Sequence, residues 1–319
     1  MPSIVVLDGH TLNPGDLSWA PLQELGPTTI FDYSATDQII DRCFSSDIII
    51  ANKAPITSEI IAALPNLKYI GVSATGYNNI DLEAARQRQI PVCNAVGYST
   101  TSVAQHVFAL LLALTNQPDQ HHKSVVRGEW AAQQHFMYTL GSIPELAGQT
   151  LGIYGLGRIG QRVARIAQAF GMEVIATHKH PERDTRPGVQ FVDLTTLFQQ
   201  SDVVSLHAPL TQENQGIVNR ALLQTMKPTA YLINTGRGPL IVENDLKEAL
   251  EKGWLAGAGL DVLSVEPPIA NHSLYSAPNL LITPHMAWAT QASRQRLLDQ
   301  TVANIQAYLE GNPRNNVAF

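Results

Sequence analysis

The sequence predicts an α/β protein built from two parallel sheets, each flanked by helices. Three observations support this class. The chain has 319 residues, which is long for one core and sufficient for two domains. Short apolar runs alternate with helical stretches through residues 1–99, and a second alternating series begins at Thr150. Such alternation is typical of βαβ units, whose successive strands run parallel.

In the first series, the predicted strands are short apolar runs bounded by turn residues. They are Ile4–Leu7, Asp47–Ala51, Tyr69–Val72 and Pro91–Cys93. The stretches Glu59–Ala63 and Leu82–Arg88 have helical spacing and lie between these strands. They are therefore predicted to be crossover helices.

A longer helix is expected next. Ser102-Val-Ala-Gln105 matches a capping box, in which a hydroxyl and an amide satisfy free N–H groups at a helix start. The following run, Val107–Leu114, is apolar on all sides. This composition predicts a helix that is buried between domains or at a contact between two copies.

The second series supplies six further strands and a final helix. The strands are predicted at Leu151–Tyr154, Val174–Thr177, Val203–His207, Tyr231–Asn234, Gly257–Leu260 and Leu280–Thr283. The tail from Gln291 to Leu309 has helical spacing, and its apolar side needs a surface to cover, which we assign to the first domain. We therefore expect a discontinuous domain of residues 1–99 plus 287–319 and a second domain of residues 100–286.

Composition excludes several classes of protein. The 45% apolar and 15% charged fractions are those of an ordinary globular enzyme, and a net charge of −6 argues against a nucleic-acid binder. No run is long enough to span a bilayer, and the amino terminus lacks the basic region of a signal peptide. No cysteine and histidine cluster has metal-ligand spacing. The two cysteines, Cys43 and Cys93, are expected to be buried thiols in a reducing cytoplasm.

A glycine-rich turn indicates a dinucleotide site. The motif Gly155-Leu-Gly157-Arg-Ile-Gly160 directly follows a predicted strand and precedes a predicted helix, Gln161–Phe170. In this position Gly155 permits a tight turn, Gly157 lets the backbone approach a pyrophosphate, and Gly160 allows close packing of helix on strand. The helix start supplies N–H groups for the phosphates. The motif therefore predicts a Rossmann domain.

The end of the next strand departs from the usual NAD pattern. An NAD site normally has an acidic residue there for the ribose 2′-hydroxyl. This chain instead has His178 and Lys179, with Arg183 nearby, and no carboxylate at the strand end itself. These side chains could accept a 2′-phosphate, although Glu182 and Asp184 follow in the same loop. The cofactor is thus NADP or NAD, with NADP favoured.

Three polar residues follow predicted strands downstream of the glycine turn: Arg237, Glu266 and His285. In a parallel sheet the carboxyl ends of the strands share one edge, where ligands bind. A guanidinium suits the carboxylate and carbonyl of a 2-keto acid, and a histidine can donate a proton near neutral pH. A carboxylate beside that histidine orients the ring and favours its protonated form. Together they predict hydride transfer to a 2-keto acid.

At these residues the chain resembles the D-2-hydroxy-acid dehydrogenase family over essentially its whole length. The matching segments are Leu151–Gly160, Ala208–Thr211, Met226–Pro228, Ile233–Gly238, Gly259–Asp261, Glu266–Pro267 and Thr283–His285. The resemblance assigns catalysis to Arg237, Glu266 and His285. It implies a flavodoxin-like substrate domain and a Rossmann cofactor domain, both doubly wound, with a cleft between them, and a homodimer as the assembly.

The resemblance also implies binding residues. Together with the glycine motif and the strand-end residues discussed above, it predicts cofactor contacts at Gly155, Gly157, Arg158, Ile159, Gly160, His178, Lys179, His207, Pro209, Thr235, Gly236 and Asp261. Asp261 would hold the carboxamide. The loop Ser73-Ala74-Thr75-Gly76 would bind the substrate carboxylate. Asn52 and Trp288 resemble the glycerate dehydrogenase (hydroxypyruvate reductase) branch, which implies a small substrate such as hydroxypyruvate or glyoxylate, although Trp288 could equally be a core aromatic.

Other functions are less consistent with the residues. A short-chain dehydrogenase needs a Tyr-x-x-x-Lys pair, which is absent at every tyrosine. A nucleophile elbow needs G-x-S-x-G, and the glycines around Ser73 have a different spacing. The alternative from another class is a corepressor-like scaffold of the same fold that senses the nucleotide. An intact set of Arg237, Glu266 and His285 favours the enzyme.

Overall fold

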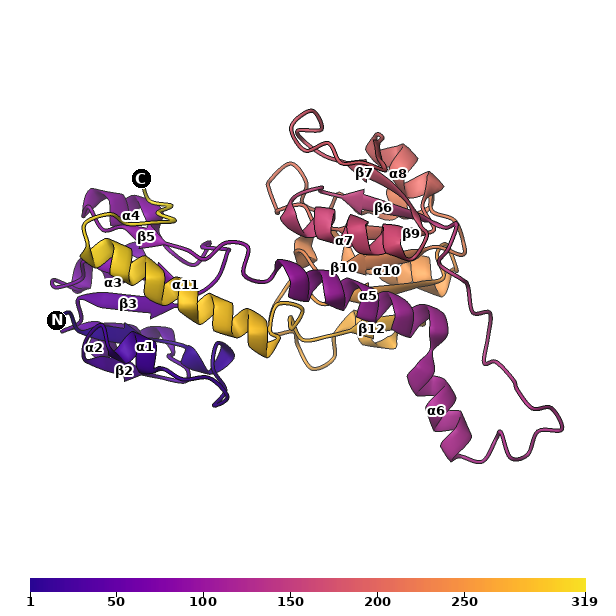
Figure 1. The fold of residues 1–319 in the computed structure, drawn as a ribbon, viewed down its shortest axis with the longest axis horizontal. Helices are drawn as coiled ribbons and strands as arrows, with labels where there is room; N and C mark the ends of the chain where they lie inside the picture. The colour runs from indigo at the N-terminus through magenta and orange to yellow at the C-terminus, as the bar shows by residue number, and fades with distance from the viewer. The chain divides into compact units, whose positions relative to one another are not determined.

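The structure is a computed structural model that describes all 319 residues. The chain divides into two compact units (Figure 1). Unit 1 comprises Met1–Ser99 and Trp288–Phe319, and unit 2 comprises Thr100–Ala287. The second crossing between them lies one residue beyond the expected boundary. Both units are α/β folds with all-parallel sheets, as the alternating strands and helices predicted.

Unit 1 is a five-stranded sheet with the order β2-β1-β3-β4-β5. Its strands are β1 (Ile4–Val6), β2 (Thr28–Ile30), β3 (Ile48–Ala51), β4 (Tyr69–Val72) and β5 (Val92–Cys93). Its helices are α1 (Ala20–Gln23), α2 (Ile39–Cys43), α3 (Ser58–Ala63), α4 (Leu82–Gln87) and α11 (Gln291–Leu309). The edge strand β2 was not predicted. It is only a three-residue strand, and its pairing with β1 is what makes it extended.

Helices cover both faces of this sheet. Along β1, Val5 belongs to one core cluster and Ile4 and Val6 belong to the other, as the alternation of strand side chains requires. Leu297, Leu298, Val302 and Ile305 of α11 are buried in the second cluster. Burying a side chain of this size contributes about 1.5–3 kcal/mol, so the carboxyl-terminal helix is an integral part of unit 1.

Unit 2 is a seven-stranded sheet with the order β12-β11-β10-β9-β6-β7-β8. Its strands are β6 (Thr150–Tyr154), β7 (Glu173–Thr177), β8 (Val189–Phe191), β9 (Val203–Leu206), β10 (Tyr231–Asn234), β11 (Gly257–Leu260) and β12 (Leu280–Ile282). Its helices are α5 (Thr100–Asn116), α6 (Pro118–Val126), α7 (Arg158–Ala169), α8 (Leu194–Gln200), α9 (Arg220–Leu223) and α10 (Glu243–Glu251). The strand order reverses between β6 and β9, and such switch points are where doubly wound sheets bind nucleotides.

Short 3-10 helices complete the chain. They are η1 (Gly9–Thr11), η2 (Thr36–Gln38), η3 (Gly238–Leu240) and η4 (Ser273–Ser276). No helix in the structure combines the length and the apolar composition that crossing a membrane requires. Both cysteines are buried and unpaired.

The structure corrects three expectations about helices in unit 2. Helix α5 begins at Thr100, so Ser102 lies inside it and does not cap it; the Ser102 hydroxyl instead donates to the carbonyl of Ala287 at 2.5 Å. The apolar run of α5 packs on β10, β11 and α7 of its own unit, so its burial needs neither a second domain nor a second copy. Helix α7 begins at Arg158, before the expected Gln161.

Candidate active site

The three candidate catalytic residues lie in consecutive loops at the carboxyl edge of the unit 2 sheet. Arg237 follows β10, Glu266 follows β11 and His285 follows β12. These strands are neighbours in the sheet, and Asn234, Leu260 and Ile282, the last residues of the three strands, are paired across it. The sheet therefore delivers a guanidinium, a carboxylate and an imidazole to one edge.

His285 and Glu266 are in direct contact. Nδ1 of His285 lies 2.6 Å from Oε2 of Glu266, and both side chains are about one-third exposed, at 29% and 32%. The other carboxylate oxygen of Glu266 accepts the N–H of Leu263 at 3.1 Å, which fixes the carboxylate. A carboxylate at Nδ1 places a proton on that nitrogen, and no hydrogen bond of His285 uses Nε2. Nε2 is thus the nitrogen that can exchange a proton with a ligand.

The buried carboxylate of Asp261 shapes the loop that carries His285. His285 has a left-handed backbone with φ of 52°, and its N–H donates to the carbonyl of Asp261 at 2.8 Å. The Asp261 side chain, 1% exposed, accepts the N–H of Met286 at 2.9 Å and that of Ala287 at 2.8 Å. One residue therefore holds three successive N–H groups. These bonds support a backbone conformation that is uncommon for a non-glycine residue.

Two further residues support this carboxylate and were not singled out from the sequence. The Thr283 hydroxyl donates to Oδ1 of Asp261 at 2.6 Å. Nε2 of His106 on α5 lies 2.9 Å from that hydroxyl and 3.5 Å from Oδ1. Because the hydroxyl donates to Asp261, it accepts from His106. His106 gave no signal in the sequence, since a histidine in a helix reveals nothing about a partner 177 positions away.

The Arg237 loop packs against the loop that carries Glu266. An Asn234 side chain closes the turn: it accepts from Gly236 at 3.0 Å and donates to the carbonyl of Arg237 at 2.9 Å. A β-carbon at Gly238 would lie 2.0 Å from the main chain of Leu263, so only glycine fits. The side chain of Arg237 is exposed, and one of its nitrogens donates to the Gly236 carbonyl at 2.8 Å.

The glycine turn has the geometry of a nucleotide loop. Gly155 has φ of 99°, and a β-carbon there would lie 2.5 Å from the amide nitrogen of Ala208. A β-carbon at Gly160 would lie 2.3 Å from the carbonyl oxygen of Gly155. By contrast, a β-carbon at Gly157 would meet nothing within 4 Å. The turn is therefore packed on the protein side and open at Gly157, where α7 begins.

Two buried polar atoms without partners lie at the same edge. They are Nδ1 of His207, after β9, and Oγ1 of Thr235, after β10. Burial lowers the pKa of His207 to about 3, so its ring is neutral, and its Nε2 bonds the Ser205 hydroxyl at 2.8 Å. A buried polar atom without a partner is costly, and a bound cofactor would remove that cost. These atoms, the open Gly157 and the helix start all fit a dinucleotide.

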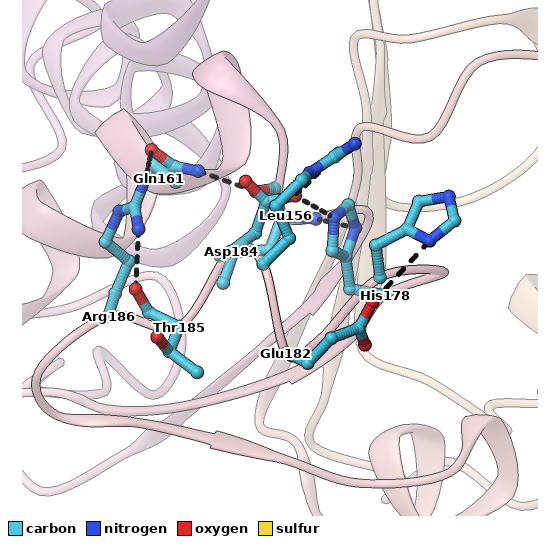
Figure 2. A network of polar contacts seen from close by, with 9 residues as sticks. Leu156, Gln161, His178, Glu182, Asp184, Thr185 and Arg186 are labelled. Carbon is cyan, nitrogen blue, oxygen red and sulfur yellow. Dashed lines mark hydrogen bonds and ion pairs between the residues drawn. The ribbon is translucent and has the colours of Figure 1, made fainter.

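The loop after β7 forms a polar network beside the glycine turn (Figure 2). Nδ1 of His178 accepts the N–H of Leu156 at 3.2 Å, and its Nε2 lies 2.8 Å from Oδ2 of Asp184. The same oxygen accepts two bonds from Arg183, at 2.7 and 3.0 Å. The Arg183 guanidinium, and after it His178, lower the pKa of the Asp184 carboxyl.

This network differs from the expected phosphate site in two respects. A carboxylate does lie at the end of the strand, because residues 179–183 fold back and bring Asp184 to His178. In addition, His178 uses Nδ1 as an acceptor, so the bonds it makes assign a neutral ring. Lys179 is exposed and forms no hydrogen bond, and Arg186 donates to Gln161 at 2.8 Å. Arg183, Lys179 and Arg186 are the cations of this loop.

The remaining implied cofactor positions surround the same edge. Arg158 and Pro209 are exposed, whereas Ile159 is half-buried against the core beneath α7. A ligand can therefore reach Arg158 and Pro209, whereas the side chain of Ile159 contributes to packing, and all three stay predictions as cofactor contacts.

The implied substrate loop, Ser73–Gly76, lies at the carboxyl end of β4 in unit 1. Its backbone is tied to β5, because Ala95 donates to the carbonyl of Ala74 at 3.0 Å and the Thr75 hydroxyl donates to that of Ala95 at 2.8 Å. The buried side chain of Asn52 donates to the carbonyl of Ser73 at 2.7 Å. The Asn52 amide nitrogen thus supports the loop from within the protein.

A residue missed by sequence analysis holds the neighbouring loop after β3. The carboxylate of Asp8 accepts the backbone N–H groups of Asn52, Lys53 and Ala54 at 2.7, 2.5 and 2.9 Å. Asp8 follows β1, which neighbours β3 in the sheet. The sequence signal that could have identified Asp8 is its position, as an acidic residue directly after a predicted parallel strand.

Trp288 lies in unit 1, at the point where the chain enters it. Its ring meets that of Tyr98 edge-on, with centroids 6.2 Å apart, and packs on the core beneath α11. Trp288 therefore packs as a core aromatic, and its contact with the substrate stays a prediction.

The chain is similar to known proteins over nearly its whole length. Residues 108–287 match the model of the D-isomer specific 2-hydroxyacid dehydrogenase NAD binding domain. A hydroxypyruvate reductase of Blautia hydrogenotrophica is 43% identical over 98% of this chain and 99% of its own length. A glycerate dehydrogenase of Methylorubrum extorquens is 38% identical over 98% of both. An acyclic imino acid reductase, solved with NADPH and D-Arg, superposes with a TM-score of 0.87 at 34% identity and covers 99% of both chains.

Proposed function

The chain belongs to the D-isomer specific 2-hydroxyacid dehydrogenase family, and we propose that it reduces hydroxypyruvate, or the smaller glyoxylate, to the 2-hydroxy acid. It is an oxidoreductase that uses a nicotinamide cofactor to reduce 2-keto acids to D-2-hydroxy acids. The substrate proposal rests on the relatives that cover nearly the whole chain.

The observation that supports the mechanism best is the contact between His285 and Glu266. Glu266 holds Nδ1, so Nε2 carries the exchangeable proton. When bound, the reduced cofactor supplies the hydride that forms the new C–H bond at C2. His285 then donates its Nε2 proton to the carbonyl oxygen, which becomes the hydroxyl, and Glu266 stabilises the charged ring until it gives that proton up. In the oxidative direction His285 accepts the proton.

Arg237 is the group proposed to bind the substrate. Its guanidinium is exposed at the same sheet edge, and its planar fork can hold a carboxylate while it polarises the adjacent carbonyl. We also predict that the Ser73–Gly76 loop makes a second contact with the substrate carboxylate.

A rate panel tests this proposal. Hydroxypyruvate, glyoxylate and pyruvate are assayed with NADH and NADPH in parallel, using wild-type protein and the His285→Ala variant. We expect turnover that is fastest with hydroxypyruvate and is nearly abolished by the substitution. Nucleotide binding without turnover of any 2-keto acid would contradict the proposal and favour a nucleotide-sensing scaffold.

We propose that the enzyme accepts both cofactors and moderately favours NADPH. In the loop of residues 178–186, three cations, Lys179, Arg183 and Arg186, face two carboxylates, Glu182 and Asp184. A 2′-phosphate carries up to two negative charges and gains charge-assisted hydrogen bonds from such a loop. The advantage of NADPH should shrink at high salt because these cations are exposed or half-buried.

We propose a second copy of this chain as the protein partner. Helix α6 and the segment that follows it extend away from the rest of unit 2 (Figure 1). They expose large apolar side chains: Val126 at 71%, Phe136 at 88% and Met137 at 54%.

The same unit has an uncharged depression of about 370 Å³ lined by Leu114, Tyr231 and Leu280 among others. Exposed apolar side chains and an uncharged hollow on one unit allow a two-fold contact between two copies. Light scattering of wild type and a Phe136→Ser, Met137→Ser variant tests it, and a monomeric wild type would contradict it.

A cytoplasmic location is also proposed, because the two buried cysteines are unpaired, as is usual in a reducing compartment. Fractionation of cells that express the chain with its native termini tests this location.

A further inference from the structure

No acidic residue directly follows β7, the place in the sequence where nucleotide domains usually have one. The paired residues Tyr154 and Thr177 end β6 and β7, and His178 is the first residue after β7. This is where the carboxylate for a ribose 2′-hydroxyl normally stands. His178 cannot replace it as an acceptor, because its Nδ1 is used by Leu156 and its Nε2 by Asp184 (Figure 2).

Asp184 is the carboxylate that the fold brings to this position. It is seven residues beyond Thr177 in the chain, yet it bonds the side chain of His178 at 2.8 Å. All three of its side-chain hydrogen bonds, one from His178 and two from Arg183, end on Oδ2. Its Oδ1 accepts none, and the side chain is 17% exposed. A half-buried carboxylate, one of whose oxygens accepts no hydrogen bond, therefore lies beside the glycine turn.

On the basis of the proposed function, we propose that Asp184 replaces the strand-end acid and decides between NADH and NADPH. Its Oδ1 accepts the 2′-hydroxyl of NADH. The same carboxylate repels a 2′-phosphate. The phosphate binds only when Arg183 breaks its hydrogen bonds to Asp184 and donates to the phosphate instead. Asp184 therefore preserves the use of NADH in a loop whose net charge favours NADPH.

The neighbouring Glu182 provides a matched control. It has the same charge and lies two residues away, but its side chain is 74% exposed and its one contact is His180 at 3.8 Å. If the Asp184 variants act only through the net charge of the loop, Glu182→Gln should have the same effect on cofactor preference. If Asp184 has a specific role, Glu182→Gln should not have that effect.

Dissociation constants of NADH and NADPH, measured by fluorescence without substrate, test the proposal in wild type, Asp184→Asn, Asp184→Ala and Glu182→Gln. Calorimetry with 2′,5′-ADP and 5′-ADP repeats the comparison on the adenosine end alone. We expect both Asp184 variants to tighten NADPH relative to NADH by at least tenfold and to shift the ADP pair in the same direction. Glu182→Gln should change the ratio less than threefold.

Equal changes for both cofactors would overturn the proposal, because a merely structural clamp on the loop would weaken both alike. An equal shift in the ratio for Glu182→Gln would also overturn it. Arg183→Gln gives an independent check, since it should weaken NADPH and leave NADH unchanged or tighter. These binding ratios remain measurable if the protein reduces no 2-keto acid, so a failed rate panel and a failed Asp184 assignment are separate results.

Discussion

The backbone of His285 is hydrogen-bonded to that of Asp261: the N–H of His285 donates to the carbonyl oxygen of Asp261 at 2.8 Å. The side chain of Asp261 then holds the next two N–H groups along the chain. The proposed proton donor, His285, is thus positioned by the buried Asp261, which follows the neighbouring strand β11.

Asp261→Asn should lower both stability and turnover. An amide is neutral and offers one acceptor oxygen in place of two, so one of the two loop N–H groups loses its acceptor. Loss of such a bond costs about 1–3 kcal/mol. We expect a lower free energy of unfolding by this amount and a kcat at least tenfold lower, as His285 moves from its position. Urea unfolding and steady-state kinetics check this, and a variant with wild-type kcat would contradict a positioning role.

Removal of the His285 imidazole should abolish proton transfer while leaving the cofactor site intact. His285→Ala should lower kcat by roughly 10²–10⁴, the usual effect of losing a general acid. Its dissociation constant for NADPH should stay close to that of wild type. His122→Ala removes an exposed histidine on α6 and serves as the control with unchanged kinetics. Near-normal turnover in His285→Ala would exclude His285 as the donor.

Arg237→Lys should behave as a severe substitution although it conserves charge. A lysine is a point donor and cannot hold a carboxylate in a planar fork. We expect KM to rise and kcat to fall together, because the same group binds the substrate and polarises its carbonyl. Steady-state kinetics against the exposed control Arg314→Lys measure this. A change confined to cofactor affinity would show that Arg237 does not face the substrate.

The stability of unit 1 should depend on pH through Asp47. Lys68, and then the N–H of Ser3, lower the pKa of its carboxyl to about 2 from an ordinary 3.8. A depressed folded pKa stabilises above the unfolded pKa, so this contribution is present above about pH 4 and is lost as pH falls toward 2. Because Lys68 is 65% exposed, we expect Asp47→Asn to cost only about 1 kcal/mol at pH 7.

Urea titrations of wild type and Asp47→Asn at pH 7 and near pH 3 check this dependence. The difference between the two proteins should shrink at the lower pH, whereas Asp37→Asn, an exposed acid, should track wild type at both. A difference that stays constant with pH would mean that Asp47 acts through packing and not through its charge.

Much of the fold could be predicted from sequence because its signals are local. The apolar runs that became β3, β4, β6, β9, β10 and β11 are flanked by turn residues, and each is a strand within one or two residues of its predicted bounds. The edge strands β2 and β8 were not predicted, since each has only three residues and pairs with a single neighbour, β1 and β7 respectively. The start of α5 was misplaced because Ser102 has a side-chain partner, Ala287, far along the chain.

The sequence by itself determined which chemical groups stand at the ends of β10, β11 and β12, because parallel strands must end at one edge. Residue types and their order along the chain were enough to place Arg237, Glu266 and His285 at that edge, and their catalytic roles stay predictions. Only the tertiary structure decided how those groups are held and what surrounds them. His106 reaches Asp261 from a helix far earlier in the chain, and Asp184 returns to His178 through a loop with no regular pattern. Such contacts form because tertiary packing brings distant backbone segments together, and the local sequence does not determine which distant segments become neighbours.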